Sequence, residues 1–350
     1  MRPGLNTRPW MAMDCLMVRV ETADGRSGWG EAFAHFVGPA TQAILDRLLG
    51  PWFIGRDAGA ITRLMEQAQH AFHGLGRNGP VLHALSGIDI ALWDLAAQRA
   101  GQPLFRLLGG DGAPLERYAS LMRYGGDVDA VARNCRRAVD CGYRVIKLHE
   151  TTVPAFRAAR DAVEGRAGIA LDVNCPWSVD EARAIAREIR DDHFYWLEEP
   201  VWPPEDFRGI ARVRDEGVTV AAGENVGTAH EFQRLFEAGA VDVAQPSVTK
   251  VGGISAMRRI LEVARVYPVR VVPHCFYWGP GYLATAHVAA STPRPTLVET
   301  AFIDLERPPH PCFEPASASL TLPDQPGLGF LPDWDALEPH VVARGMTPSG

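Results

Sequence analysis

Three acidic residues each stand at the end of an apolar run, and they are evenly spaced along the chain. Asp172, Glu198 and Glu224 follow one another at intervals of 26 residues. A strand with its following helix takes about that many residues, so the spacing predicts that the three carboxylates lie at equivalent ends of three successive parallel strands. Three oxygen ligands that meet at one point suit a hard divalent cation, and we predict that Mg²⁺ binds there.

This arrangement is typical of a (β/α)8 barrel, in which the carboxyl ends of the strands face one mouth that holds the active site. Surface salt bridges would explain one strand-end carboxylate but not three in phase. Glu199 competes with Glu198 for a place in the cluster. Because neighbouring residues of a strand point to opposite faces, only one of these two can face the mouth.

Composition favours a soluble globular enzyme of one large and one smaller domain. The chain has 350 residues, of which 47% are hydrophobic and 22% charged. A net charge of −7 without basic runs gives no footprint for nucleic acid or for an anionic membrane. We see no stretch of about 18 apolar residues, so no transmembrane helix is expected.

The six cysteines are scattered without a C-x-x-C pair. They therefore indicate neither a thiolate metal site nor a disulfide framework. The first residues include Arg2, Pro3 and Arg8 and have no apolar signal-peptide core. We expect a cytoplasmic protein.

Residues 1–112 predict a small α+β domain. An alternating strand at 16–22 turns at 23–25 and returns through 27–31 as a hairpin. A long helix at 81–100 is rich in Ala, Leu and Ile, and Gly101-Gln-Pro ends it.

Residues 113–306 predict the (β/α)8-type barrel with the active site. Strands are expected at 117–121 and 145–149, and later strands end near Gln245, His274 and Glu299. Asp127 is an expected helix cap, and Ser178 with Glu181 forms a capping box. Residues 307–350 are a proline-rich tail with a strand near 317–322, whose apolar content indicates that it packs on the rest of the protein.

Short motifs follow one another in a fixed order along most of the chain. They are Lys147-x-His149, Asp172-x-Asn174, Trp196-Leu-Glu-Glu-Pro200, Gly223-Glu-Asn225, Lys250-Val-Gly-Gly253, Pro273-His274 and Leu297-Val-Glu299. The helix beginning Ser86-Gly-Ile-Asp precedes them and leads to Leu107-Leu-Gly-Gly110. Together these motifs resemble the enolase superfamily and, more narrowly, its mandelate racemase and muconate lactonizing enzyme group.

The resemblance implies a modified (β/α)8 TIM barrel, closed by a capping domain that the N-terminal segment and the C-terminal tail form together. It also implies Mg²⁺ on the three carboxylates and a homo-oligomer, since relatives are commonly oligomeric. Residues 1–13 lack the extended strand usual at this place in the group. We therefore expect either a start further upstream or a shortened cap.

The resemblance assigns catalysis to four residues, two of which lie on one strand. Relatives often carry Lys-x-Lys where this chain has Lys147 and His149, so His149 takes the place of the base and Lys147 supplies positive charge. An imidazole exchanges protons near neutral pH without the perturbation that a lysine needs. A histidine satisfied within the barrel wall is the alternative for His149.

His274 matches the histidine that relatives use as the opposite-face base or general acid. Ser247 stands where the group has an aspartate that orients this histidine, and the lysine of the muconate-lactonizing type is absent as well. Ser247 can hold a tautomer by hydrogen bonding, but it cannot stabilise an imidazolium by charge. We expect Ser247 and Asn174 to lie beside the substrate.

Glu299 matches a glutamate that donates a hydrogen bond to the substrate carboxylate. To donate it must be protonated, so burial is expected to raise its pKa. The alternative is an ordinary carboxylate paired with Lys147. The aromatic run 276–278 could line the pocket, although aromatics at such turns more often serve packing, and the loop 33–37 could cover the substrate.

These residues predict Mg²⁺-dependent removal of the α-proton of a small-molecule carboxylate. The preferred reaction is dehydration of a sugar acid, an aldonate or an aldarate, to a 2-keto-3-deoxy acid by a lyase. Racemisation or epimerisation and cycloisomerisation are alternatives. A carboxylate-binding protein on a catalytically impaired barrel is the alternative from another class.

Overall fold

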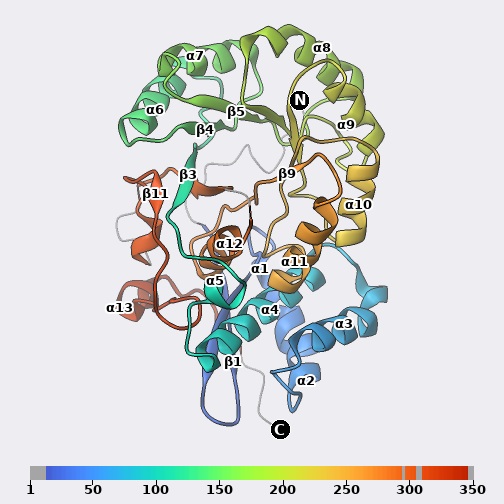
Figure 1. Ribbon diagram of the computed structural model, residues 1–350, viewed down its shortest axis with the longest axis vertical. Helices are drawn as coiled ribbons and strands as arrows, with labels where there is room; N and C mark the ends of the chain where they lie inside the picture. Colours follow the sequence, from blue (N-terminus) through green and yellow to red (C-terminus); the bar gives the residue numbers. More distant parts are fainter. Residues whose placement is uncertain (1–12, 294–295, 305–309, 346–350) are drawn as a thin grey trace.

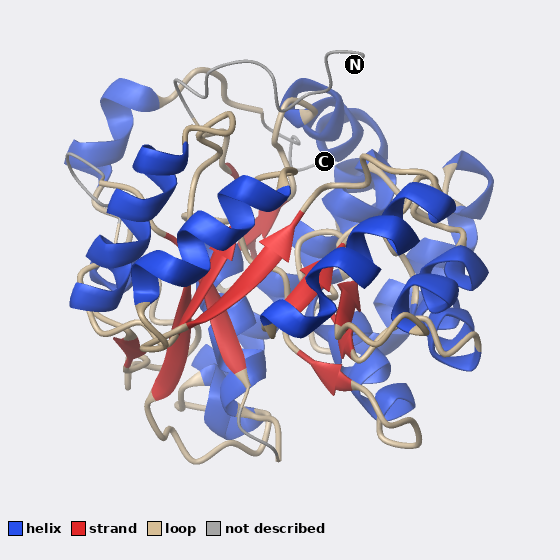
Figure 2. Ribbon diagram, turned by 90° about the horizontal axis from the view of Figure 1, so that it is seen from above, coloured by secondary structure: helices blue, strands red, loops and turns tan. Residues whose placement is uncertain are grey.

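Parallel strands curl around a common axis in the larger part of the molecule (Figure 2). The computed structural model describes residues 13–293, 296–304 and 310–345. Within them, the ladder runs from β10 through β3, β4, β5, β6, β7 and β8 to β9. The strands are β3 (Leu115–Ser120), β4 (Val145–Leu148), β5 (Gly168–Asp172), β6 (Trp196–Glu198), β7 (Val220–Ala222), β8 (Val243–Ala244), β9 (Arg270–Val271) and β10 (Leu297–Ala301).

The seam between β9 and β10 is bridged by side chains. In the described part of the chain no backbone ladder joins these two strands. Thr296 Oγ1 donates to the Val271 carbonyl at 2.7 Å, and the Cys275 amide donates to Glu299 Oε2 at 2.8 Å. The predicted modified barrel is confirmed, and its last strand is held in part by a residue expected in the active site.

A layer of buried side chains fills the barrel interior below the mouth. Its members come from each barrel strand or the residue next to it: Tyr118, Val145, Ala170, Trp196, Ala221, Val243, Val272 and Leu297. Such a layer makes the barrel a packed core rather than a pore. The side chains at the carboxyl ends of the strands therefore lie above a rigid, packed layer.

Helices surround the strands, and all of them are amphipathic except α12, which is buried along almost its whole length. They are α6 (Val128–Asp140), α7 (Val153–Val163), α8 (Val179–Ile189), α9 (Phe207–Arg214), α10 (Ala229–Glu237), α11 (Gly253–Ala264) and α12 (Pro280–Ala290). The expected caps are present, since Asp127 accepts from the amides of Asp129 and Ala130, and Ser178 and Glu181 form a capping box. A second capping box, Thr228 with Glu231, begins α10.

The N-terminal segment forms a hairpin and a group of helices on one side of the barrel (Figure 1). The elements are β1 (Leu16–Glu21), β2 (Ser27–Ala32), α1 (Gly38–Ile44), η2 (Leu45–Leu49), α2 (Gly50–Phe53), α3 (Ile61–Ala71), η3 (His73–Leu75), α4 (Pro80–Arg99) and α5 (Leu104–Leu107). Glycines let α4 approach β2 closely, because a Cβ on Gly30 would stand 2.0 Å from the Gly87 carbonyl oxygen. The predicted hairpin and long helix are confirmed, whereas the question of a strand within residues 1–12 lies outside the described residues.

The C-terminal tail returns along the barrel and the cap (Figure 1). It contains η5 (Pro311–Phe313), β11 (Ser319–Leu320), α13 (Trp334–Leu337) and η6 (Glu338–His340). β11 adds antiparallel to β3, and one α4 carboxylate, Asp94, accepts from the Leu328 amide at 2.7 Å and the Trp29 amide at 2.8 Å. The tail is therefore tied to the capping domain, as expected.

One helix corrects the expectation about apolar stretches. α4 is long and apolar enough in composition to cross a membrane, which the sequence reading did not recognise. However, 83% of its most apolar window is buried inside the protein. This burial is what a core helix of a domain shows.

Two buried carboxylates of the cap meet the N-termini of barrel helices. Glu31 Oε2 accepts from the Gly281 amide at 2.8 Å in the first turn of α12, and Asp89 Oδ1 accepts from the Ser255 amide at 3.0 Å in the first turn of α11. Acidic groups are favoured at helix N-termini by the free amides and the helix dipole. These two contacts attach the cap to α11 and α12, the last two barrel helices before β10.

Replacement of Glu31 by glutamine is expected to change how stability depends on pH. Burial raises the pKa of Glu31 to about 7, an effect that hydrogen bonds from Gly281, Cys15 and Gly279 oppose. A raised carboxyl pKa means that the wild type loses stability as the pH rises from about 4.5 to above 7, by roughly 3 kcal/mol, whereas Glu31→Gln has no such loss.

Urea unfolding of both proteins at pH 5 and pH 8.5 measures this effect. Glu31→Gln should gain stability relative to the wild type at the higher pH. Glu205→Gln, at an exposed site, is the matched control and should show a constant difference. Parallel pH profiles for Glu31→Gln and the wild type would contradict this account.

Candidate active site

The three evenly spaced acids come together at the barrel mouth. Asp172 ends β5, Glu198 ends β6, and Glu224 follows β7 by two residues. Asp172 and Glu198 are direct partners in the ladder, so the strand register places their side chains side by side. One oxygen from each of the three carboxylates lies within 4.8 Å of the others.

The neighbouring glutamates have different surroundings. Glu198 faces the cluster, where its Oε2 accepts from Trp196 Nε1 at 2.8 Å. Glu199 adopts a positive φ of 47° and accepts from the Gly223 amide at 2.9 Å and the Cys175 thiol at 3.2 Å. Glu199 therefore fixes the loop that leads to Glu224, and Glu198 alone of the pair joins the cluster.

Lys147 stands in the middle of the acidic groups. Its ammonium lies 3.1 Å from Asp172, 2.9 Å from Glu198 and 2.7 Å from Glu299, and all four side chains are at most 1% exposed. Burial lowers the pKa of Lys147, but the charges of Glu198, Glu299 and Asp172 outweigh burial and hold it well above its usual value. Lys147 is therefore a fixed positive charge, consistent with the role expected for it.

The donor set fits a hard cation. It consists of carboxylate oxygens alone, as Mg²⁺ prefers. Burial raises the pKa of Asp172, but Lys147 and His149 hold it at about 2; burial likewise raises that of Glu224, but His274 and Lys250 hold it well below its usual value. Asp172 and Glu224 therefore carry negative charge in a largely desolvated site, where a bound cation would help to compensate them. Asp172, Glu198 and Glu224 would hold the ion.

Glu299 corrects one expectation. Burial raises its pKa, as expected, but the nearby charges of Lys147 and His274 and the hydrogen bond from Lys147 outweigh burial and hold its pKa at about 2. The predicted net rise is therefore wrong for this arrangement, because the sequence did not show how close Lys147 lies. Glu299 is an ionised partner of Lys147 here, which was the alternative.

The two candidate histidines each present Nε2 to the carboxylate cluster. His149 Nε2 lies 3.3 Å from Asp172 Oδ2, and its Nδ1 donates to the Leu121 carbonyl. Because Nδ1 is held by the backbone, Nε2 is the ring nitrogen that faces the cluster and can exchange a proton there. His274 Nε2 lies 3.0 Å from Glu224 Oε2.

A pair of hydroxyl groups supports His274 on its other side. Ser247 Oγ lies 3.3 Å from His274 Nδ1, and Ser247 also hydrogen-bonds the Tyr277 hydroxyl, which lies 3.5 Å from the same nitrogen. Burial raises the pKa of Tyr277 well above its usual range, so its hydroxyl stays neutral. The sequence predicted residues 276–278 only as a possible pocket wall and did not indicate that Tyr277 contacts His274, although its place three residues after His274 was a usable signal.

Asn174 lies beside the cluster rather than alone in the pocket. It has a positive φ of 52°, and its backbone amide donates to Asp172 Oδ1 at 3.1 Å. Its side-chain Nδ2 donates to the same oxygen. Asn174 therefore orients Asp172. In the loop 33–37, the Phe33 ring contacts the side chains of Lys250 and His83.

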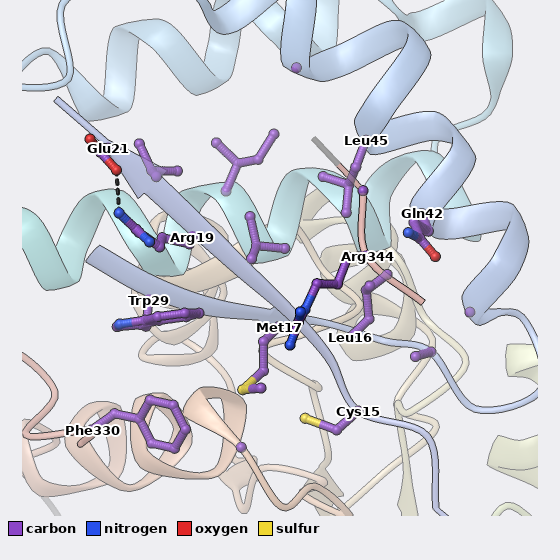
Figure 3. A pocket seen from close by; sticks show the side chains of 18 of the residues that line it. Cys15, Leu16, Met17, Arg19, Glu21, Trp29, Gln42, Leu45, Phe330 and Arg344 are labelled. Carbon is purple, nitrogen blue, oxygen red and sulfur yellow. Dashed lines mark hydrogen bonds and ion pairs between the residues drawn. The ribbon is translucent and has the colours of Figure 1, made fainter. Parts of the chain in front are cut away.

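A large groove lies elsewhere in the described protein. It occupies about 2850 Å³ between the β1–β2 hairpin, the segment from α1 to α2, and the tail (Figure 3). Met17, Trp29, Leu45, Phe330 and Arg344 are among its lining residues, and none of the nine predicted site residues lines it. The carboxylate cluster, not this groove, has the chemistry of an active site.

Comparison with known proteins gives the same family in both parts of the chain. Residues 10–109 match the model of the mandelate racemase/muconate lactonizing enzyme N-terminal domain, and residues 130–336 match the enolase C-terminal domain-like model. The chain is 32% identical to D-galactarolactone cycloisomerase of Agrobacterium fabrum, over 92% of this chain and 90% of that protein. It is 29% identical to arabinonate dehydratase of Saccharolobus solfataricus, over 93% and 90%.

A solved structure of a racemase from Streptomyces coelicolor A3(2) with bound magnesium has a similar fold. The TM-score is 0.79 at 28% identity, and the match covers 92% of this chain and 94% of that one.

Adjacent glutamates offer a matched test of the proposed ion site. Glu198→Gln removes one carboxylate of the cluster and is expected to weaken Mg²⁺ binding at least roughly tenfold, since ligation favours a charged oxygen. Glu199→Gln keeps an oxygen for the Gly223 amide and should leave Mg²⁺ affinity within a few-fold of the wild type. Titration calorimetry with MgCl₂ measures both. Equal losses in the two variants would contradict the assignment of Glu198.

Proposed function

Because this chain belongs to the enolase superfamily, in its mandelate racemase/muconate lactonizing enzyme group, we propose that it is a sugar acid dehydratase. The proposed reaction removes the α-proton of an aldonate or aldarate and eliminates water to give a 2-keto-3-deoxy acid. The supporting observation is that two imidazoles, His149 and His274, each present Nε2 to one carboxylate cluster, at 3.3 Å and 3.0 Å.

Mg²⁺ is the cofactor, and when bound it stabilises the negative charge that the substrate carboxylate gains as the α-proton leaves, which is worth several kcal/mol. Lys147 adds a second positive charge in the same buried place. Its three carboxylate contacts hold the ammonium still, so little reorganisation is needed when charge develops.

The proton steps fall to the two histidines. His149 Nε2 accepts the α-proton, because its Nδ1 is held by the Leu121 carbonyl. The C–H electron pair then forms the new double bond, and the β-hydroxyl leaves with a proton from His274 Nε2. The enol product gains a proton on the β-carbon and loses its hydroxyl proton, which gives the 2-keto acid.

Ser247 and Tyr277 position His274 in this proposal. Their hydroxyls lie 3.3 Å and 3.5 Å from Nδ1 and can donate or accept. A carboxylate at residue 247 could only accept. The site therefore keeps the ring orientation that relatives obtain from aspartate without placing another anion among the four acids near Lys147.

Isomerisation is the second candidate. The similarity to D-galactarolactone cycloisomerase favours it, since that reaction class needs the same first proton removal. A binding protein without catalysis is the third candidate. The joint presence of Lys147, His149, His274 and Glu299 around one cluster argues against it.

We further propose the division of the chain into a cap at 1–112, a barrel at 113–306 and a returning tail at 307–350. We propose a homo-oligomer in the cytoplasm that acts on small molecules. Six free cysteines, all within the described residues, are consistent with a reducing compartment.

Incubation with a panel of aldonates and aldarates in D₂O with Mg²⁺ tests the reaction class. Dehydration predicts a 2-keto acid detectable by semicarbazide or NMR. Deuterium at the α-carbon without a new product would instead indicate racemisation or exchange, and a lactone-derived isomer would indicate cycloisomerisation. No α-proton chemistry on the whole panel would favour the binding protein.

Replacement of His149 tests the proposed base. His149→Asn is expected to lower kcat by at least roughly 100-fold, since general-base catalysis contributes about that much. Mg²⁺ affinity should stay near that of the wild type, because Asp172 remains in place. His230→Asn, at an exposed helical site, is the matched control. Turnover retained by His149→Asn would remove His149 from the mechanism.

A further inference from the structure

Lysine is almost absent from this chain. Of its 35 basic residues, only Lys147 and Lys250 are lysines, and the others are arginines. Lysine offers a compact ammonium where arginine offers a planar fork, so the two are not equivalent at a shaped site. Lys147 lies in the carboxylate cluster. The second lysine follows β8 at the same end of the barrel, yet the mechanism above does not use it.

Lys250 stands at the seam between the barrel and the cap. Its Nζ lies 5.0 Å from the centre of the Phe33 ring, which comes from the cap, and the Phe33 amide donates to the Thr249 carbonyl at 3.3 Å. The Phe33 ring also lies 6.4 Å from the ring of Tyr277, whose hydroxyl contacts Ser247 beside His274. Lys250 therefore lies next to the candidate active site, on the side that the cap covers.

Within the described residues, this ammonium has no anionic partner. Among the described residues, no carboxylate oxygen lies within 4.0 Å of Lys250 Nζ, although the side chain is partly buried. By contrast, Lys147 has three carboxylate partners. A partly desolvated ammonium on an aromatic face is favourable, but it keeps its capacity for a hydrogen-bonded anion.

His83, a titratable neighbour on the cap side, stays neutral. His83 is 5% exposed, its ring stacks edge-on with Phe33 at 5.0 Å, and its ring nitrogens have no hydrogen-bond partner in the described residues. Burial, and secondarily the charge of Lys250, lowers the pKa of His83 to about 3. Of the three side chains in this contact, Lys250, Phe33 and His83, only Lys250 carries a positive charge.

We propose that Lys250, seated on Phe33, binds a second carboxylate of the substrate, at the end remote from the reacting carbon. The inference rests on the proposed function and narrows it, because the substrate is then an aldarate rather than an aldonate. The first carboxylate belongs at Lys147 and the cluster. A six-carbon diacid carries the second charge that the unpaired ammonium of Lys250 complements.

Binding of inert acids tests this without turnover. Adipate and hexanoate have the same length and lack the β-hydroxyl, so neither can be dehydrated. In the presence of Mg²⁺, calorimetry should show that the wild type binds adipate roughly 10- to 100-fold more tightly than hexanoate, the range for a hydrogen bond to a charged group. Lys250→Met should abolish this difference and leave hexanoate binding unchanged.

Kinetics with natural-type acids supply the second readout. Lys250→Met should lower kcat/KM for a six-carbon aldarate roughly 10- to 100-fold, mostly through KM, and leave any activity on the matching aldonate within a few-fold. Lys250→Arg keeps the charge and should recover part of the loss. Circular dichroism of each variant confirms that the fold is intact.

The outcomes separate the two proposals. Equal loss on aldarate and aldonate would place Lys250 in the chemistry and overturn its role in distal recognition, as would a wild type that binds adipate no better than hexanoate. If neither class of acid reacts but adipate is still preferred and the preference depends on Lys250, the dehydratase proposal fails and the subsite stands.

Discussion

The rest of the structure depends on a cluster of four acidic side chains and one buried ammonium at the barrel mouth. Lys147 contacts Asp172, Glu198 and Glu299, and Glu224 completes the cluster. Buried charges are costly unless they are paired and hydrogen-bonded, so this group exists only because a rigid frame prevents its members from moving apart. The packed layer across the barrel interior, from Tyr118 to Leu297, supplies that frame.

Buried carboxylates also attach the cap to the barrel, but their partners are the amides at helix N-termini instead of a lysine. Glu31 and Asp89 reach the first turns of α12 and α11, the helices that follow the loops of His274 and Ser247. Asp94 holds the hairpin and the tail together. The cap is thus fixed next to the catalytic loops, and its Phe33 is brought over Lys250. The proposed recognition of the remote end of the substrate depends on this docking.

The neighbourhood of His274 shows how the local charge balance limits residue choice. Glu224 already lies 3.0 Å from its Nε2. A neutral Ser247–Tyr277 pair on the Nδ1 side orients the ring without another buried anion, whose desolvation would have to be compensated. Glu199 shows a related separation of roles, since it is adjacent to Glu198 in sequence but holds the Gly223 amide.

The sequence by itself determined the barrel, its helix caps and the convergence of Asp172, Glu198 and Glu224. All of these follow from local periodicity and from a repeat of 26 residues, which strand geometry converts directly into position. Only the tertiary structure decided that Glu299 pairs with Lys147, that Tyr277 supports His274, and that Lys250 faces Phe33. These properties depend on distances between side chains from different strands and from the cap. Such contacts leave no periodic pattern in the sequence, so the sequence alone cannot predict them.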